Sequence, residues 1–327
     1  MSASQDELSF RNAIREAIDE ELAADSDVIF FGEDVAEAGG VFAVTPGLRD
    51  KYGDERVFDT PISELALSSA AFGSAVAGLR PIVEIMFADF LFLAMDSLVN
   101  QSAKYWYLSN EQKSIPLVVR SAVGGGIGFG PIHSQVPISW FLGVPGLKII
   151  APSTANDAKR LLKAAIRDEN PVLFFEHKAL YATTEVREEL TGQEILGKAR
   201  IVREGSDITL VSCMKGVADC LEAARLLSEI GISAEVLDLR SLRPMDNEMI
   251  QSSFSKTKSL LVVEEGPITG GWAGEVISIA NEVNNDGMKL WRIATEDRPI
   301  PFSPALENEF YPSATTIFES VRERHAR

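Results

Sequence analysis

Apolar residues along this chain recur with two alternating periods. Near the N-terminus, Ser9 can cap a helix in which Phe10, Ile14, Ile18 and Leu22 repeat at helical spacing. Short apolar runs, which predict strands, follow at residues 28–31, 82–86, 116–120, 147–150 and 172–175. The stretches between these runs have helical composition. This alternation predicts a parallel sheet with helices on both faces.

The alternation lapses between residues 181 and 198, where the chain is polar and charged, and then resumes. Strands are predicted at residues 208–213, 234–239, 259–264 and 290–294, with helices at 217–230 and 273–283. We therefore expect an α/β protein of two doubly wound domains. The first covers residues 1–185, the linker covers 186–198, and a smaller second domain covers 199–327.

Charge, apolar content and cysteine count exclude some kinds of binding partner and some cellular compartments. The formal net charge of −17 would repel a phosphate backbone, so nucleic acid is not an expected partner. No stretch is apolar enough to span a membrane, and the N-terminus lacks the features of a secretion signal. Two cysteines, Cys213 and Cys220, fit neither a disulfide framework nor a zinc site. We expect a cytoplasmic protein.

A glycine-rich segment, residues 124–130, follows a predicted strand and leads into His133. It lacks both the Gly-Lys-Ser/Thr ending and the acidic residue of nucleotide-binding fingerprints. The residues alone leave a plain loop and a ligand site equally open. His133 is an acid/base candidate, because the usual pKa of histidine, about 6.5, lies near working pH.

Glu64 stands where a strand ends and an Ala/Ser-rich helix, residues 65–79, begins. The simplest interpretation of Glu64 is a first-turn acid favoured by the helix dipole. The small residues of the helix predict a closely packed interface. Met86 and Phe90 follow the next strand, at the edge where parallel sheets bind ligands. Without further context, both would be assigned to the core.

Ordered motifs over nearly the whole chain resemble the β subunits of 2-oxo acid dehydrogenase E1 components, of the pyruvate, branched-chain and acetoin types. The runs that carry the resemblance are FGEDVAEAGGVF, GLRDKYGDERVFDTPISE, AVAGLRPIVEIMFADF, HSQ, VPGLKIIAPSTANDAKRLLKAAIRDENPVLFFEHKALY and VLDLRSLRPMD. The resemblance implies an N-terminal domain that binds the aminopyrimidine of thiamin diphosphate and a C-terminal domain of the transketolase type.

The resemblance also implies partners. In this family the Gly-Asp-Gly motif that binds magnesium and diphosphate belongs to the α chain, and no Gly-Asp-Gly occurs here. The expectation is an α2β2 heterotetramer with thiamin diphosphate between unlike subunits and magnesium bound mainly by the α chain. Its reaction would be oxidative decarboxylation of a 2-oxo acid with acyl transfer to a lipoyl-bearing E2.

Residue by residue, Glu64 matches the family glutamate that hydrogen-bonds N1′ of the aminopyrimidine and so favours loss of the cofactor's C2 proton. Ile62, Met86 and Phe90 match the apolar residues that line the pyrimidine pocket, with Phe90 stacked on the ring. His133 matches the histidine that faces C2, where it would position substrate or transfer a proton.

The resemblance further suggests a potassium site made mostly of backbone carbonyls with one carboxylate. Oxygen ligands suit a hard cation. The matching residues are Leu117, Ala165, Ile166, Asp168 and Asn170.

Three departures from the family pattern leave the substrate and acceptor open. Gly143 stands where many members have a second histidine, Ile132 precedes His133 where pyruvate-type enzymes often have Gln, and residues 213–215 replace an aromatic-Gly pair. Two alternatives to the dehydrogenase therefore stay open. One is a split transketolase-like or acyloin-forming enzyme that transfers the unit to an aldehyde, and the other is a non-catalytic partner subunit.

Overall fold

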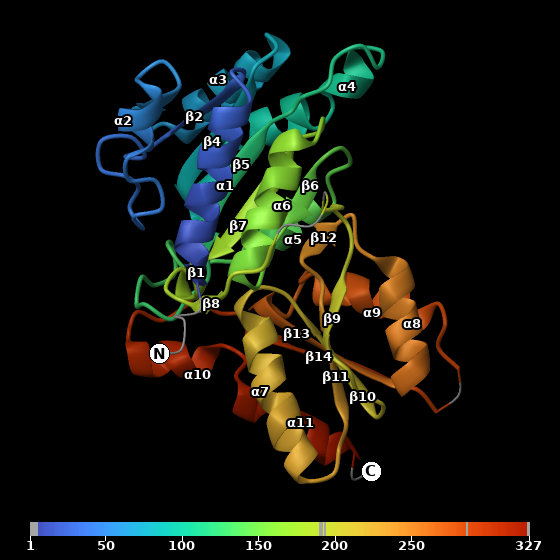
Figure 1. Cartoon of the computed structure of the whole chain (residues 1–327). Helices are drawn as coiled ribbons and strands as arrows, with labels where there is room; N and C mark the ends of the chain where they lie inside the picture. The colour runs from blue at the N-terminus through green and yellow to red at the C-terminus, as the bar shows by residue number, and fades with distance from the viewer. Residues whose placement is uncertain (1–5, 190–191, 193, 286, 326–327) are drawn as a thin grey trace. The chain divides into compact units, whose positions relative to one another are not determined.

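The computed structural model describes residues 6–189, 192, 194–285 and 287–325. The chain forms two compact units (Figure 1). Unit 1 comprises Met1–Val123 and Gly143–Leu196, and unit 2 comprises Gly124–Leu142 and Gly197–Arg327. Both are α/β units, which confirms the predicted fold class.

Unit 1 contains one extended parallel sheet and a short antiparallel strand pair. Its elements are β1 (Glu7–Ser9), α1 (Phe10–Ala24), β2 (Val28–Gly32), α2 (Leu48–Tyr52), β3 (Val57–Asp59), α3 (Glu64–Val76), β4 (Arg80–Phe87), the 3-10 helix η1 (Ala88–Phe92), the π-helix η2 (Asp96–Ser102), α4 (Tyr105–Leu108), β5 (Val118–Val123), β6 (Lys148–Ile150), α6 (Ala155–Arg167), β7 (Val172–His177), the 3-10 helix η3 (Lys178–Leu180) and β8 (Thr184–Val186).

The strands of the unit 1 sheet run in the order β6-β7-β5-β4-β2-β3, each parallel to its neighbour. β2, β5 and β7 are buried along their whole length, as expected for strands covered on both faces. The predicted cap of α1 is confirmed, because the Ser9 hydroxyl accepts the Asn12 N–H at 3.2 Å. α1 packs against α6 (Figure 1).

Unit 2 contains a second sheet with helices on both faces. Its elements are α5 (Ile138–Leu142), β9 (Arg200–Arg203), β10 (Ile208–Ser212), α7 (Lys215–Glu229), β11 (Ala234–Asp238), β12 (Ser241–Arg243), α8 (Asn247–Thr257), β13 (Ser259–Pro267), α9 (Ala273–Asn281), β14 (Lys289–Thr295), α10 (Pro304–Phe310) and α11 (Ala314–His325).

The unit 2 sheet has the order β14-β13-β10-β11-β9, in which only β9 is antiparallel to its neighbour. α7 packs with α11 against the sheet, and α8 packs with α9. Met214, just before α7, has φ +51°, a region that favours glycine. The positive φ explains why other members of the family have an aromatic-Gly pair here, because glycine adopts this conformation without strain.

The observed units differ from the predicted domains in one segment. Residues 124–142 were expected in the first domain, but their contacts group them with unit 2. The predicted linker, 186–198, begins with the last residue of β8 and includes residues 190, 191 and 193, which lie outside those described. Within the described ranges, no helix combines the length and the apolar character that a membrane span requires.

Candidate active site

The predicted pyrimidine-binding residues of unit 1 follow two parallel strands, β3 and β4, at the carboxyl edge of the sheet. β2 lies between β3 and β4. The chain passes from β2 to β3 on one side and then returns to β4 on the other, so the strand order reverses here. A crevice at such a reversal is where open α/β sheets bind ligands. Ile62 and Glu64 follow β3, while Met86 and Phe90 stand at and just after the end of β4.

Glu64 is the first residue of α3 and is buried, with 6% of its surface exposed. Ile62, two residues earlier, is 77% exposed, while Met86 and Phe90 are half-buried. The result is an arrangement of one buried carboxyl with partly or largely exposed apolar side chains at the same edge of the sheet. It fits a flat aminopyrimidine, which needs a carboxyl at a ring nitrogen and apolar side chains against its faces.

Glu33 is a residue of this edge that sequence reasoning missed. It follows β2 directly, is 3% exposed, and its Oε1 atom makes no hydrogen bond within the described part of the chain. Burial, together with the nearby charges of Glu64 and Asp34, raises the pKa of Glu33 to about 7. A signal was present in the sequence, because Glu33 is the first charged residue after an entirely apolar strand.

The raised pKa of Glu33 predicts a pH-dependent stability. The native state holds this proton up to about pH 7, whereas an ordinary glutamate with a pKa of 4.5 loses it earlier. Stability is therefore lost as pH rises from 4.5 to 7. We expect Glu33→Gln to stabilise the protein above pH 7 by up to about 3 kcal/mol and to have little effect at pH 4.

Thermal unfolding of wild type and Glu33→Gln between pH 4 and pH 8, without added cofactor, checks this expectation. Glu37→Gln is the matched control, because Glu37 is an exposed glutamate of the same loop and is not among the charges that raise the pKa of Glu33. A constant difference between wild type and Glu33→Gln across the range would contradict the raised pKa.

A buried charge network lies in the strands behind this edge. The Arg120 guanidinium of β5 donates to Glu84 of β4 at 2.7 Å and to both oxygens of Glu176 of β7 at 2.7 and 2.8 Å. The Tyr181 hydroxyl donates to Glu176 at 2.9 Å. Burial alone would lower the pKa of Arg120, but the charges of Glu176 and Glu84 outweigh it and keep the guanidinium charged. The network cross-links three adjacent strands.

His133 belongs to unit 2, within the segment that follows the glycine-rich loop. Its N–H faces the Gly130 carbonyl oxygen at 3.5 Å, and the Gly124 N–H donates to the Gln135 carbonyl at 3.4 Å. The segment is thus folded back on itself around His133. Glu64, the other predicted catalytic residue, belongs to unit 1.

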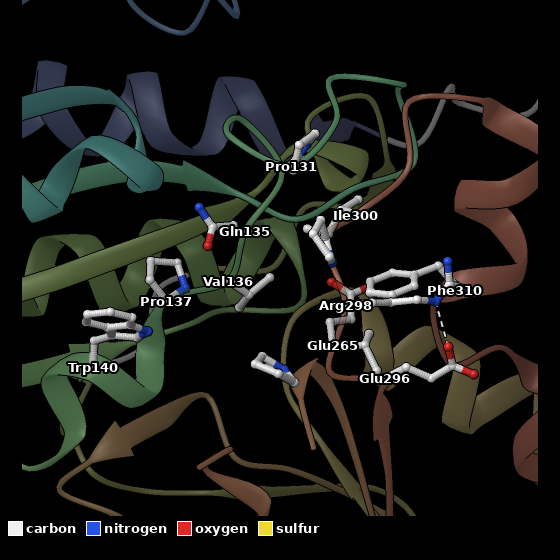
Figure 2. A pocket seen from close by; sticks show the side chains of 13 residues that line it. Pro131, Gln135, Val136, Pro137, Trp140, Glu265, Glu296, Arg298, Ile300 and Phe310 are labelled. Carbon is white, nitrogen blue, oxygen red and sulfur yellow. Dashed lines mark hydrogen bonds and ion pairs between the residues drawn. The ribbon is translucent and has the colours of Figure 1, made fainter. Parts of the chain in front are cut away.

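The continuation of this segment forms one wall of a pocket of about 360 Å³ within unit 2 (Figure 2). Pro131, Gln135 and Trp140 lie on the segment, and Glu265 and Arg298 lie on the opposite wall. Arg298 donates to Glu296 at 2.6 Å and lies over the ring of Phe310 at 5.0 Å. The pocket carries charges of both signs beside an exposed indole, so its lining alone selects no single ligand class.

The five residues of the potassium prediction come together at one corner of unit 1, but protein cations already face their oxygen atoms. Arg80 donates to the Ile166 carbonyl at 3.2 Å, and Lys148 pairs with the Asp168 carboxylate. The other Asp168 oxygen accepts the backbone N–H of Asn170 at 2.8 Å and its side-chain N–H at 2.9 Å. The Leu117 carbonyl accepts the Val172 N–H at 2.8 Å. These contacts give the potassium site no support, and it stays a prediction.

The magnesium expectation concerns the partner chain rather than this one. Among the residues that the structure describes, no group of three or more His, Cys, Asp or Glu side chains is arranged to hold a metal ion.

Comparison with known proteins matches two parts of the chain to established families. Residues 6–184 match the family described as transketolase, pyrimidine binding domain, and residues 197–317 match transketolase, C-terminal domain. A solved structure described as a split-gene transketolase, an inactive β4 tetramer, has a TM-score of 0.80, with 22% identity and 97% of each chain covered. That likeness concerns the fold.

Curated relatives are closer in sequence. The chain is 42% identical over 327 residues to the β-1 subunit of the mitochondrial pyruvate dehydrogenase E1 component of Arabidopsis thaliana, covering 98% of this chain and 90% of the relative. It is also 42% identical over 322 residues to the β subunit of 2-oxoisovalerate dehydrogenase of Bacillus subtilis, covering 97% and 98%. The chain therefore belongs to the family of E1 β subunits of thiamin-diphosphate-dependent 2-oxo acid dehydrogenases, within the transketolase-like fold.

Proposed function

We propose that this chain joins an E1 α chain in an α2β2 enzyme that decarboxylates a 2-oxo acid oxidatively and transfers the acyl unit to a lipoyl-bearing E2. The observation that carries the proposal is the buried Glu64 at the carboxyl edge of the unit 1 sheet. It occurs in a chain that is 42% identical to E1 β subunits acting on two different 2-oxo acids. The proposed substrate is therefore pyruvate or a branched-chain 2-oxo acid.

In this proposal the chain binds the pyrimidine end of thiamin diphosphate and the α chain holds its diphosphate and magnesium. The cofactor, when bound, supplies the electron sink that makes loss of carbon dioxide possible. Glu64 holds a proton at the pyrimidine nitrogen N1′, and its burial keeps water from competing for that hydrogen bond. Met86 and Phe90 cover the ring, and His133 positions the acyl group or transfers a proton.

The α chain is proposed to cover the exposed apolar surface of unit 1. The outer face of α3 is made of small residues, with Ala66, Ser69, Ala70 and Gly73 all exposed. Large apolar side chains gather on the elements that pack near α3, where Leu93 is 58%, Tyr107 79% and Leu108 66% exposed. An apolar surface of this kind marks an interface, and small residues allow a partner helix to approach closely.

One observation favours a second candidate, acyl transfer to an aldehyde. A Cβ built at Gly143 would meet no atom within 4 Å, so contact at the Cβ position does not require glycine where many family members have histidine. The missing imidazole therefore points to a difference in substrate or acceptor. An acyloin-forming enzyme would keep Glu64 and Phe90 while using a different acceptor site.

The test is the activity of this chain co-expressed with its genomic α neighbour, with thiamin diphosphate and magnesium, against a panel of 2-oxo acids. Each acid is offered with a lipoyl domain and, separately, with aldehyde acceptors. Acylation of the lipoyl domain supports the dehydrogenase proposal and names the substrate. Carbon–carbon bond formation without lipoyl acylation supports the second candidate, and turnover of neither kind supports a non-catalytic partner subunit.

His133→Ala is expected to retain cofactor binding and to lower the rate of acyl transfer by about 10²-fold or more, because a positioned proton donor or acceptor contributes that much. Single-turnover acylation of the lipoyl domain measures the effect, and titration of thiamin diphosphate checks cofactor binding. His133→Gln keeps a hydrogen-bonding group without a titratable proton and separates positioning from proton transfer. A fully active His133→Ala enzyme would rule out both roles.

A further inference from the structure

The glycine-rich loop, residues 124–131, is held along its length by one short segment near the C-terminus. That segment, Phe302 to Tyr311, contains α10 and is called here the C-terminal clamp. The loop and the clamp belong to the same unit. A Cβ at Gly125 would lie 2.3–2.5 Å from atoms of the Tyr311 ring, and a Cβ at Gly130 would lie 2.3–2.6 Å from the Phe302 ring. A side chain at either glycine would therefore collide with the clamp unless the aromatic ring moved.

Between these two contacts, the Gly128 N–H donates to Glu307 Oε2 at 2.9 Å. Glu307 is 1% exposed although it lies on a short helix whose neighbouring residues face solvent. Its Oε1 atom is buried without a hydrogen-bond partner among the described residues. Burial of a carboxyl in this way is costly, and a hydrogen bond from a backbone N–H to a carboxylate is among the stronger kinds.

The clamp also reaches the residues on either side of His133. The Tyr311 hydroxyl lies 3.5 Å from the carbonyl oxygen of Ser134, which follows His133 in the chain. Gly130, packed against Phe302, faces the His133 N–H with its carbonyl. Phe310, beside Tyr311, lines the pocket whose other wall begins at Pro131 (Figure 2). The clamp thus contacts the backbone on both sides of His133.

We propose that the C-terminal clamp sets the position of His133, with Glu307 and Tyr311 as positioning residues that act through the glycine-rich loop. The role of His133 in this proposal rests on the proposed function. The contacts between the clamp and the loop do not depend on that function. If Glu307 had a purely structural role, it would stabilise unit 2, and its loss would affect C2 proton exchange and lipoyl acylation equally.

The test uses the assembled α2β2 enzyme with Glu307→Ala, Glu307→Gln and the control Glu309→Ala. Glu309 lies on the same helix and is exposed, so its replacement removes the same charge without touching the loop. Hydrogen exchange of the backbone amides of residues 124–135 reports on the clamp itself. Exchange of the cofactor C2 proton reports on the Glu64 half of the site, and lipoyl acylation reports on His133.

We expect Glu307→Ala to speed exchange of the loop amides by about 10- to 100-fold and to slow lipoyl acylation by a similar factor. The rate of C2 proton exchange should stay within about twofold of wild type, because the substitution of Glu307 leaves Glu64 unchanged. Glu307→Gln should restore most of both losses, since its amide oxygen can accept the Gly128 N–H. Glu309→Ala should change none of the three readouts.

Unchanged loop exchange in Glu307→Ala would overturn the clamp, and faster loop exchange with unchanged acylation would overturn its role in positioning His133. A parallel fall in C2 exchange and acylation would identify a general structural role and would also overturn the proposal. If the wild-type enzyme acylated no lipoyl domain, the proposed function would fail, while the loop exchange would still decide whether the clamp exists.

A second pair of variants covers the case in which Glu307→Ala does not fold. Gly125 does not have a positive φ, and the three atoms nearest to a Cβ built there all belong to Tyr311, so the Tyr311 side chain is the main obstacle to Gly125→Ala. Gly125→Ala and Tyr311→Ala should each slow acylation, and the double variant should lose less than the sum of the two because the added methyl group then has room. Strictly additive losses would overturn the contact on which the clamp depends.

Discussion

Glu64→Gln is expected to slow exchange of the C2 proton of bound thiamin diphosphate by about 10²- to 10⁴-fold, the range that a positioned acid or base contributes. Glutamine keeps the size and the hydrogen-bonding shape of glutamate but has no proton to share with N1′. Because Glu64 is buried, with 6% exposed, solvent cannot replace the missing group. The loss should therefore appear in the proton-transfer step rather than in cofactor affinity.

The measurement is hydrogen–deuterium exchange at C2 in the assembled enzyme, quenched with acid at successive times. Glu55→Gln is the matched control, because Glu55 is an exposed glutamate in the same region of unit 1. Gel filtration of both variants confirms that assembly is retained. An unchanged exchange rate in Glu64→Gln would remove the proposed role of this residue, whatever the activity of the enzyme.

The sheets could be predicted from the sequence because their strands bury both faces and read as continuous apolar runs. β7, predicted at residues 172–175, runs from Val172 to His177, and β10 and β11 were placed with similar accuracy. The antiparallel pair of β1 and β8 was missed, since Thr184–Val186 lies in a polar segment without period and is held by backbone pairing. Pairing of that kind leaves no hydrophobic pattern to read.

Of the candidate site, the sequence predicts single residues, which stay predictions, but not the side chains and segments that surround them. Glu64, Met86 and Phe90 stand at strand ends, where the rule for parallel sheets locates ligands. The clamp could not be predicted, because Gly128 and Glu307 are separated by 179 residues and neither belongs to a motif that names the other. The glycine pattern indicated only that something approaches the loop closely, and the approaching element turned out to be the chain's own C-terminal segment.

The buried network of Arg120 leads to the second large expected effect, which concerns stability. Arg120 lies in a strand predicted from its apolar neighbours, but its role as a buried charge was not predicted. Arg120→Met is expected to lower the free energy of unfolding by about 3–5 kcal/mol, because it leaves the carboxylates of Glu84 and Glu176 buried without a counter-ion. The unfolding midpoint should fall by roughly 10 °C.

Arg225→Met is the matched control for this prediction. Arg225 also pairs with two carboxylates, Glu222 and Glu229, but its side chain is 51% exposed. Water and salt screen such pairs, so the same substitution should have a much smaller effect on the unfolding midpoint there than Arg120→Met. Calorimetric unfolding of the two variants and the wild type at neutral pH gives the comparison directly.

A triple variant separates loss of charge balance from loss of packing. Adding Glu84→Gln and Glu176→Gln to Arg120→Met removes the uncompensated charges while leaving the volume nearly unchanged, and the Tyr181 hydroxyl can still donate to the amide oxygen at position 176. Replacement of a whole buried ion network by neutral groups is often close to neutral in stability. The triple variant should therefore unfold well above Arg120→Met. If it unfolds at the same temperature, the cost of Arg120→Met is a packing defect, and the three strands do not depend on the balance of their charges.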